Sequence, residues 1–292
     1  MDLELLGVAV SNLRHQGLRS YLTLLGVIIG IAAIFTLVSI GDGLNAAVTA
    51  QFEQLGSNTI FVAPGGAFSS GGGTPTAPVR FSDNDVSRLE GYAEIQHVIP
   101  FYSANTTVRR QTEEVSALIF SYDPLKTRPL ETSGVIDVES GRAFDEQDVF
   151  VAMVGKDFAE KGFVRELDLK STIEIAGKRY KIVGILKPNA QTIGGGGGPN
   201  TRNTVWIPEK AAKLTFTDFG YSFMMVQTYN KDQIPDAADK MKRYFERQYG
   251  KDQVSVQTSE QILDRIKQVL ALISMVLLVI AGVSLVVGGI GI

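Results

Sequence analysis

Two long apolar runs flank a stretch of mixed polarity. No charged residue occurs from Ser20 through Gly41, and nearly every position from Leu22 to Ile40 is apolar. At about 1.5 Å of rise per residue, this first run reaches roughly 33 Å as a helix, enough for a hydrocarbon core of about 30 Å. Gln268 to Ile292 also lacks any charge. The pattern therefore predicts two membrane-spanning helices with a separately folded domain strung between them.

The alternative for the first run is a secretory signal peptide, because Arg14 and Arg19 precede it and small residues follow it. The apolar part of a signal peptide is usually about 7 to 15 residues long. This run is longer and continues past two glycines without a clean cleavage pattern. We therefore interpret it as a membrane span.

The flanks of the first span predict its orientation. Arg14 and Arg19 lie just before it, whereas no Lys or Arg occurs from Gly41 through Val79. Positive residues favour the cytoplasmic side, so these two arginines are the expected topology determinants. The protein is expected in the cell membrane as a multi-pass protein, with a cytoplasmic N-terminus and a large extracytoplasmic domain.

Small residues mark one side of each predicted span. Gly26 and Gly30 form a GxxxG pair in the first, and Ser284 and Gly288 lie in the second. Small faces allow helix backbones to approach closely, so these four residues are the helix-packing candidates. Asp2 to Ser20 has apolar residues at steps of three and four and is interpreted as an amphipathic interfacial helix, or as a simple lead-in to the span.

The middle of the chain predicts an α+β fold with two lobes. Strand-like runs and amphipathic helices alternate there, and the texture changes near Tyr122, where brief apolar stretches alternate with turn residues. A second lobe is therefore expected as an insertion into the first. The predicted segments are an interfacial helix (1–20), the first span (21–41), the first part of lobe 1 (42–121), the inserted lobe (122–220), the remainder of lobe 1 with its stalk (221–267), and the second span (268–292).

Composition and motifs offer little support for catalysis. The chain has no cysteine, two histidines and a formal net charge of −3, which gives no reason to expect disulfides, thiolate metal sites or nucleic acid. His15 and His97 lack zinc-site spacing, and the glycine tracts lack the Lys-Ser/Thr ending of a P-loop. Neighbouring carboxylates such as Asp83 with Asp85, or Glu113 with Glu114, are ordinary on helix caps and exposed strands. We therefore expect a non-enzymatic chain with no cofactor, metal or catalytic residue.

Several segments, in this order and spacing, closely resemble MacB-type and FtsX-like ABC transporter permeases. They are Leu18 to Ala32 (LRSYLTLLGVIIGIA), Gly41, Gly43, Leu55 to Pro64 (LGSNTIFVAP), Ser140 to Asp148 (SGRAFDEQD), Val154-Gly155, Ile173 to Leu186 (IEIAGKRYKIVGIL), Val205 to Pro208 (VWIP) and Val287 to Ile292 (VGGIGI). The resemblance covers essentially the whole chain.

The resemblance implies a MacB-like periplasmic core domain between the first two of four membrane helices. It also implies a permease that dimerises with a second copy, contacts membrane lipid and pairs with a cytoplasmic ABC ATPase, with an extracytoplasmic adaptor as a further candidate partner. ATP-driven closure would be transmitted through the helices to the outer domain, in the export of a drug, peptide or lipid-linked substrate. The chain departs from the pattern because it stops after the second helix. A fragment, a split subunit and a truncated gene model all remain open.

A competing class has the same plan of helix, outer domain and helix. Membrane-anchored sensors and scaffold proteins share it, although sensors normally continue into a cytoplasmic signalling module. A neighbouring gene for an ABC ATPase would favour the permease, and one for a kinase or response regulator would favour the sensor.

Overall fold

The computed structural model describes residues 58–65, 79–127, 136–187 and 204–290, with scattered helical positions between 28 and 50. These residues form two compact units. One comprises Gln51–Ile262, and the other comprises Met1–Ala50 with Leu263–Ile292. The first unit is the α+β domain that the sequence predicted, and the described residues of the second are helical.

The regular elements of the described part follow one another along the chain. They are β1 (Thr59–Pro64), α3 (Asp83–Glu90), β2 (Ile95–Arg110), β3 (Glu113–Tyr122), β4 (Val138–Gly141), β5 (Val151–Gly155), α5 (Lys156–Lys161), β6 (Thr172–Ile175), β7 (Lys178–Leu186), β8 (Thr204–Pro208), α6 (Glu209–Thr215), β9 (Phe223–Thr228), η1 (Lys231–Gln233), α7 (Ile234–Tyr249), β10 (Val254–Thr258) and α8 (Ser259–Ile290).

Lobe 1 is an antiparallel sheet with helices on one face. Its strand order is β10-β1-β9-β2, and only the first half of β2 takes part. Alternate residues of these strands pack against α3 and α7, as period-two burial on one face of a strand requires. The core includes Ile60, Val226, Leu89, Met241 and Phe245, each at most 1% exposed.

Lobe 2 is a closed ring of six strands. The second half of β2 pairs with β3, and pairing continues through β8, β5 and β7. The short strand β6 then joins β7 back to β2 and closes the ring, while β4 pairs with β7 outside the ring and forms an edge. Alternate residues of all six strands point into one apolar cluster, which also receives Phe158 and Ala159 of α5 and Ala211 and Ala212 of α6. Closure is one way in which β proteins protect exposed strand edges.

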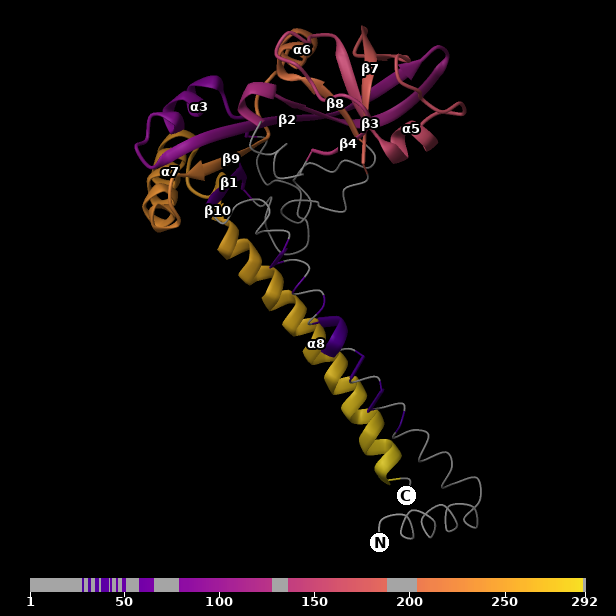
Figure 1. Ribbon diagram of the computed structural model, residues 1–292. Coiled ribbons are helices and arrows are strands. Elements are labelled where there is room, and N and C mark those ends of the chain that lie inside the picture. Colours follow the sequence, from indigo (N-terminus) through magenta and orange to yellow (C-terminus); the bar gives the residue numbers. More distant parts are fainter. Residues whose placement is uncertain are drawn as a thin grey trace. The chain divides into compact units, whose positions relative to one another are not determined.

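Strand β2 belongs to both lobes. Figure 1 shows it running from the strands beside α3 and α7 to the strands around α5. Tyr102, Val108 and residues of β3 contribute to the ring's core. The packing thus favours a start of the second lobe within β2, earlier than the predicted limit at 121/122. That limit follows a rise in turn residues along the sequence, whereas the residues of β2 already pack into the lobe 2 core from Tyr102 onward. The domain limits themselves stay a prediction.

Helix α8 begins without a break after β10. Thr258 is positioned as its N-cap: its Oγ1 accepts from the backbone N–H of Gln261 at 3.1 Å, and the side chain of Gln261 accepts from the backbone N–H of Thr258 at 3.1 Å. This reciprocal pair is a capping box. The Ser259 hydroxyl also donates to the carbonyl of Thr59 at 3.0 Å, which ties the start of the helix to β1.

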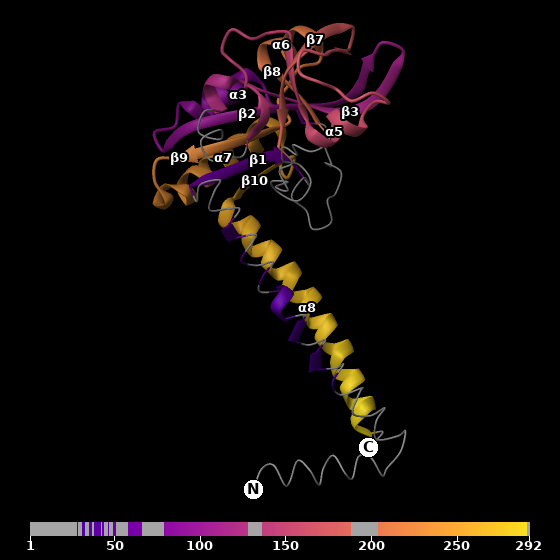
Figure 2. The ribbon, with the colours of Figure 1, turned by 45° about the vertical axis from the view of Figure 1, so that its right-hand side comes forward.

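In the helical unit, the described positions between 28 and 50 lie along α8 (Figure 1 and Figure 2). The two segments approach closely, because a Cβ added at Gly41 would lie 3.4 Å from the Ser274 hydroxyl oxygen. The described positions among 43–50 are helical. Among the residues whose placement is described, no helix is both long enough and apolar enough to cross a membrane.

Candidate functional site at the joint between the lobes

The joint between the lobes is organised around α3, whose start has a strong local signal. Ser82 caps the helix: its hydroxyl accepts from the N–H of Asp85 at 3.3 Å, and the Asp85 carboxylate accepts from the N–H of Ser82 at 2.7 Å. A Ser with an acidic residue three positions later satisfies two N-H groups that a helix start otherwise leaves unpaired. The expected ordinary capping role of this carboxylate is confirmed.

Asp85 also fastens α3 to α7 within lobe 1. It is 1% exposed, and its two carboxylate oxygens accept from the hydroxyls of Tyr244 at 2.7 Å and Tyr249 at 2.6 Å. Burial by itself would raise the pKa of Asp85, but the hydrogen bonds from Tyr249, Ser82 and Tyr244 together lower it below 3.8. Burial and the same carboxylate raise the pKa of Tyr244 to about 12. Asp85 is therefore a buried anion with a full set of donors.

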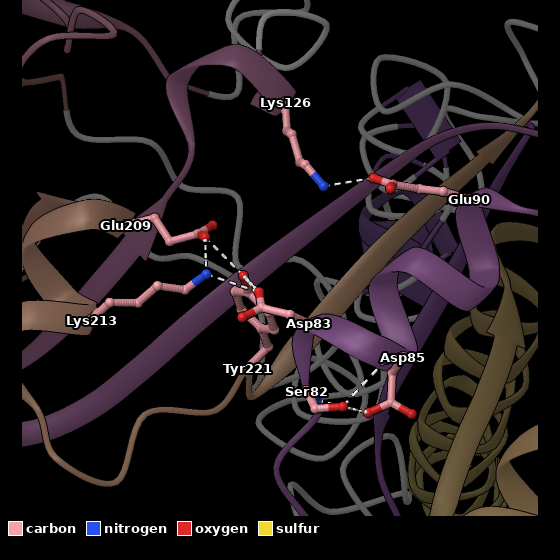
Figure 3. Close-up of polar contacts among 8 residues, drawn as sticks. All are labelled: Ser82, Asp83, Asp85, Glu90, Lys126, Glu209, Lys213 and Tyr221. Atoms are coloured by element: carbon pink, nitrogen blue, oxygen red, sulfur yellow. Dashed lines mark hydrogen bonds and ion pairs between the residues drawn. The ribbon is translucent and has the colours of Figure 1, made fainter.

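The opposite end of this network reaches lobe 2 (Figure 3). Lys213 of α6 lies 2.8 Å from Oδ1 of Asp83 and 2.9 Å from Oε1 of Glu209. The Tyr221 hydroxyl lies 2.7 Å from the same Asp83 oxygen and 2.8 Å from Glu209 Oε1. One lysine and one tyrosine therefore bridge a carboxylate of each lobe.

The charges at this bridge perturb one another. Burial opposes the ionised form of Asp83, but hydrogen bonds from Lys213 and Tyr221 lower its pKa. Burial likewise disfavours the Lys213 ammonium, and Asp83 and Glu209 more than compensate and raise its pKa. The Tyr221 hydroxyl, buried and facing two carboxylates, has a strongly raised pKa and stays protonated. The arrangement holds opposite charges next to one another at the joint.

A second ion pair joins the lobes at the far end of α3. Lys126, in the helical turn 124–127 that follows β3, lies 2.6 Å from Oε1 of Glu90 (Figure 3). Asp83 stands in the first turn of α3 and Glu90 in its last. Lobe 2 thus contacts both ends of one short helix of lobe 1.

Beneath these ion pairs the joint is aromatic. Tyr102 of β2 stacks on Phe219, with ring centroids 4.8 Å apart, and Phe219 packs against the cores of both lobes. Arg80 lies over the Tyr102 ring, 5.7 Å from its centroid, and donates to the carbonyl of Ser103 at 3.0 Å. Burial raises the pKa of Tyr102 to about 12. The joint therefore has an apolar interior and a polar rim.

The site residues proposed from the sequence lie elsewhere. Arg14, Arg19, Gly26 and Gly30 fall outside the described residues. Ser284 and Gly288 lie in α8, but their side chains are outside the described part. The role of these residues in topology and helix packing stays a prediction.

The sequence alone does not predict the joint, because the residues that pair across it are far apart along the chain. Asp83 and Lys213 are separated by 130 positions, and single charges on exposed helices carry no pairing signal. Glu113 and Glu114 are structural too: Glu114 pairs with Arg109 across the β2–β3 hairpin, and Glu113 accepts from the N–H of Val164. His97 is exposed on β2. Within the described ranges, no group of three or more His, Asp or Glu side chains is arranged to hold a metal ion.

Comparison with known proteins identifies relatives of the whole fold. The family described as "MacB-like periplasmic core domain" matches residues 20–244. An uncharacterised ABC transporter permease of Methanocaldococcus jannaschii is 24% identical over 260 residues, covering 89% of this chain and 62% of the relative. The macrolide export ATP-binding/permease protein MacB of Bartonella henselae is 26% identical over 273 residues, covering 89% of this chain and 39% of the relative. The chain thus spans less than two thirds of either relative.

Two solved structures share the fold. The periplasmic region of MacB from Actinobacillus actinomycetemcomitans aligns with a TM-score of 0.56 at 15% identity, covering 73% of this chain and 94% of that one. The extracellular domain of the ABC-type transporter YknZ from Gram-positive bacteria aligns with a TM-score of 0.52 at 21% identity, covering 69% of this chain and all of that one. The chain therefore shares its α+β fold with these two domains.

Proposed function

The chain belongs to the MacB-like periplasmic core domain family, and from this premise we propose that it forms part of the permease subunit of a MacB- or FtsX-type ABC transporter. The large domain lies outside the cell membrane, and the apolar runs 21–41 and 268–292 cross it. The chain itself is non-catalytic. ATP is hydrolysed by a separate cytoplasmic ATPase subunit, and the permease acts as a dimer in contact with membrane lipid, with an extracytoplasmic adaptor as a further candidate partner.

The junction between β10 and α8 carries this proposal. The strand passes into the helix with no loop, and the capping box of Thr258 and Gln261 with the Ser259 bond to Thr59 holds the first turn against the sheet. A helix that begins inside a sheet's hydrogen-bond network transmits displacement better than one that begins after a flexible loop. This geometry supports a mechanical role for α8 rather than a catalytic role.

In the proposed mechanism, closure of the ATPases shifts the membrane helices, and α8 passes that shift to lobe 1. Rearrangement of the outer lobes then drives export of a drug, peptide or lipid-linked substrate. Two distant sites are coupled through an element with more than one arrangement, as allostery requires. The relatives named for macrolide export make a macrolide the first substrate to test.

The experiment interrupts the two stalks, which are the stretches 44–55 and 259–267 that link lobe 1 to the apolar runs. A flexible Gly-Ser segment is inserted after Leu55 in one variant and before Ser259 in another, in the complete transporter with its ATPase. A matched control carries the same insertion after Gly177, in the exposed β6–β7 turn. Macrolide resistance of the cells should be lost in both stalk variants and kept in the control, with expression and ATPase assembly unchanged in all three.

Normal resistance in both stalk variants would refute rigid coupling and favour a passive docking platform. The alternative function, a membrane-anchored sensor or scaffold, gains support if the adjacent gene encodes a kinase or response regulator rather than an ABC ATPase.

A further inference from the structure

Helix α3 is attached to the two lobes by contacts of very different character. We propose that α3 is a releasable latch: it stays fixed to lobe 1 and lets go of lobe 2 at Lys126 and Lys213, so that the lobes have a closed and an opened arrangement. This inference concerns the outer domain alone and does not require the chain to transport anything.

The attachment to lobe 1 is buried. Val86 and Leu89 lie in the lobe 1 core at 3% and 0% exposure, and Asp85 accepts four hydrogen bonds, two from Ser82 and two from tyrosines of α7. Breaking this side would expose apolar surface and remove the two tyrosine donors from a buried, ionised carboxylate. It is therefore the side that holds.

The attachment to lobe 2 is solvated. The side chains of the two ion pairs are exposed by 37% for Lys213, 69% for Asp83, 34% for Lys126 and 43% for Glu90. Exposed ion pairs are weak and are screened by salt over a distance of about 8 Å at physiological ionic strength. The joint should therefore part between α3 and lobe 2.

The closed arrangement also leaves one group poorly satisfied. Glu209 Oε2 is buried and has no hydrogen-bond partner among the described residues, although Oε1 of the same carboxylate has two. A buried carboxylate oxygen without a donor is unfavourable. Opening of the latch would admit water to this oxygen, which offsets part of the loss of the ion pairs and brings the two arrangements closer in free energy.

The lobes would open without coming apart. β2 passes through both sheets, and Phe219 packs against both cores. The opening is therefore a rotation about the β2 segment near Tyr102, with α3 and α6 moving away from each other. Such a rotation would supply the second arrangement of the outer lobes that the proposed transport cycle needs.

The test measures a distance between the lobes. The chain has no native cysteine, so spin labels can be placed at Lys242→Cys on α7 and Glu160→Cys on α5, both exposed. Double electron–electron resonance on the full chain in detergent gives the distance distribution. We compare the labelled parent, the latch variant K126M/K213M, and a control variant K156M/K240M, whose lysines pair with Glu139 inside lobe 2 and Glu94 inside lobe 1.

We expect one dominant distance in the parent at low salt. The latch variant, and the parent in 1 M salt, should show a second distance whose population rises on the order of three- to tenfold, as loss of two weak ion pairs implies. The control variant should match the parent, and the fluorescence of the buried Trp206 should be unchanged throughout.

An unchanged distribution in the latch variant would overturn the proposal. The same shift in the control variant would do so too, because it would show a general effect of charge removal. Neither result bears on the stalk insertions, so failure of the latch is distinguishable from failure of the proposed transport function.

Discussion

Replacement of Asp85 tests whether one buried carboxylate holds α3 in place. Asp85→Ala removes the acceptor of four hydrogen bonds, among them the N–H of Ser82 and the hydroxyls of Tyr244 and Tyr249. Hydrogen bonds to charged groups contribute roughly 1.5–3 kcal/mol each and are not additive when they share one acceptor. Because Tyr244 and Tyr249 are only partly buried and their hydroxyls can turn to water when the carboxylate is absent, we expect a loss of about 3 kcal/mol in the free energy of unfolding.

A matched control lies two residues away. Asp83 is in the same first turn, but its side chain is 69% exposed, and the Tyr221 hydroxyl keeps Glu209 as a partner when Asp83 is removed. Asp83→Ala should therefore cost less than about 1 kcal/mol. Asp85→Asn should lie between the two, because the amide keeps the shape and one acceptor but turns a donor toward donors.

The assay is urea unfolding of the detergent-solubilised chain, followed by far-UV circular dichroism and by the fluorescence of Trp206. With a slope of about 2 kcal/mol per molar urea, a loss of 3 kcal/mol lowers the midpoint by about 1.5 M. If Asp85→Ala lowers the midpoint no more than Asp83→Ala does, the buried network is not what holds α3. A change of slope would instead indicate that the lobes unfold separately.

Three further predictions use the same chain. Folding lowers the pKa of Asp85, so the carboxylate stabilises the fold fully above its ordinary pKa of 3.8 and loses this contribution as pH falls through the lower folded pKa. The urea midpoint should therefore be constant from about pH 5 to 8 and fall below about pH 4. In Asp85→Asn the midpoint should fall less over the same acid range. Cysteines at Ser70 and Gly196 should react with an impermeant maleimide in intact cells, and labelling only after lysis would reverse the proposed topology. The purified chain should show no saturable ATP binding at micromolar nucleotide, and such binding would reveal a nucleotide site outside the P-loop pattern.

The sequence predicts a helix start or a hairpin where the residues that determine it lie close together along the chain. Ser82, with Asp85 three positions later, is a local signal for the start of α3 at Asp83, and Gly177 between two runs of alternating apolar residues is a local signal for the β6–β7 hairpin. Gly177 has φ +78°, a conformation that glycine adopts without strain. These features depend on residues within a few positions of one another, so one sequence suffices to predict them.

Two elements of lobe 2 were missed for different reasons. β4 (VESG) is four residues long, mostly exposed and lies at an edge, so it has no apolar alternation to detect. α6 (EKAAKLT) directly follows a strand and is only seven residues long, although Pro208 before it and its alanines were usable signals. Short elements are stabilised by what they pack against, which a single sequence does not reveal.

Closure of the ring shows why the lobe boundary was also hard to place. Only Val108 and Arg109 of β2 pair with β6, and that contact turns an open sheet into a ring. Because the ring is closed, β3 and the second half of β2 belong to lobe 2, although nothing in their apolar pattern distinguishes them from lobe 1 strands. Its core is enclosed by paired strands. Among the described residues, the lobes meet through the shared strand β2, the side chain of Phe219, the hydrogen bond between Tyr221 and Glu209, and exposed ion pairs. Deformation should therefore concentrate at the joint, since the ring would have to break backbone pairs to change shape and the joint would have to break only side-chain contacts, most of them solvated.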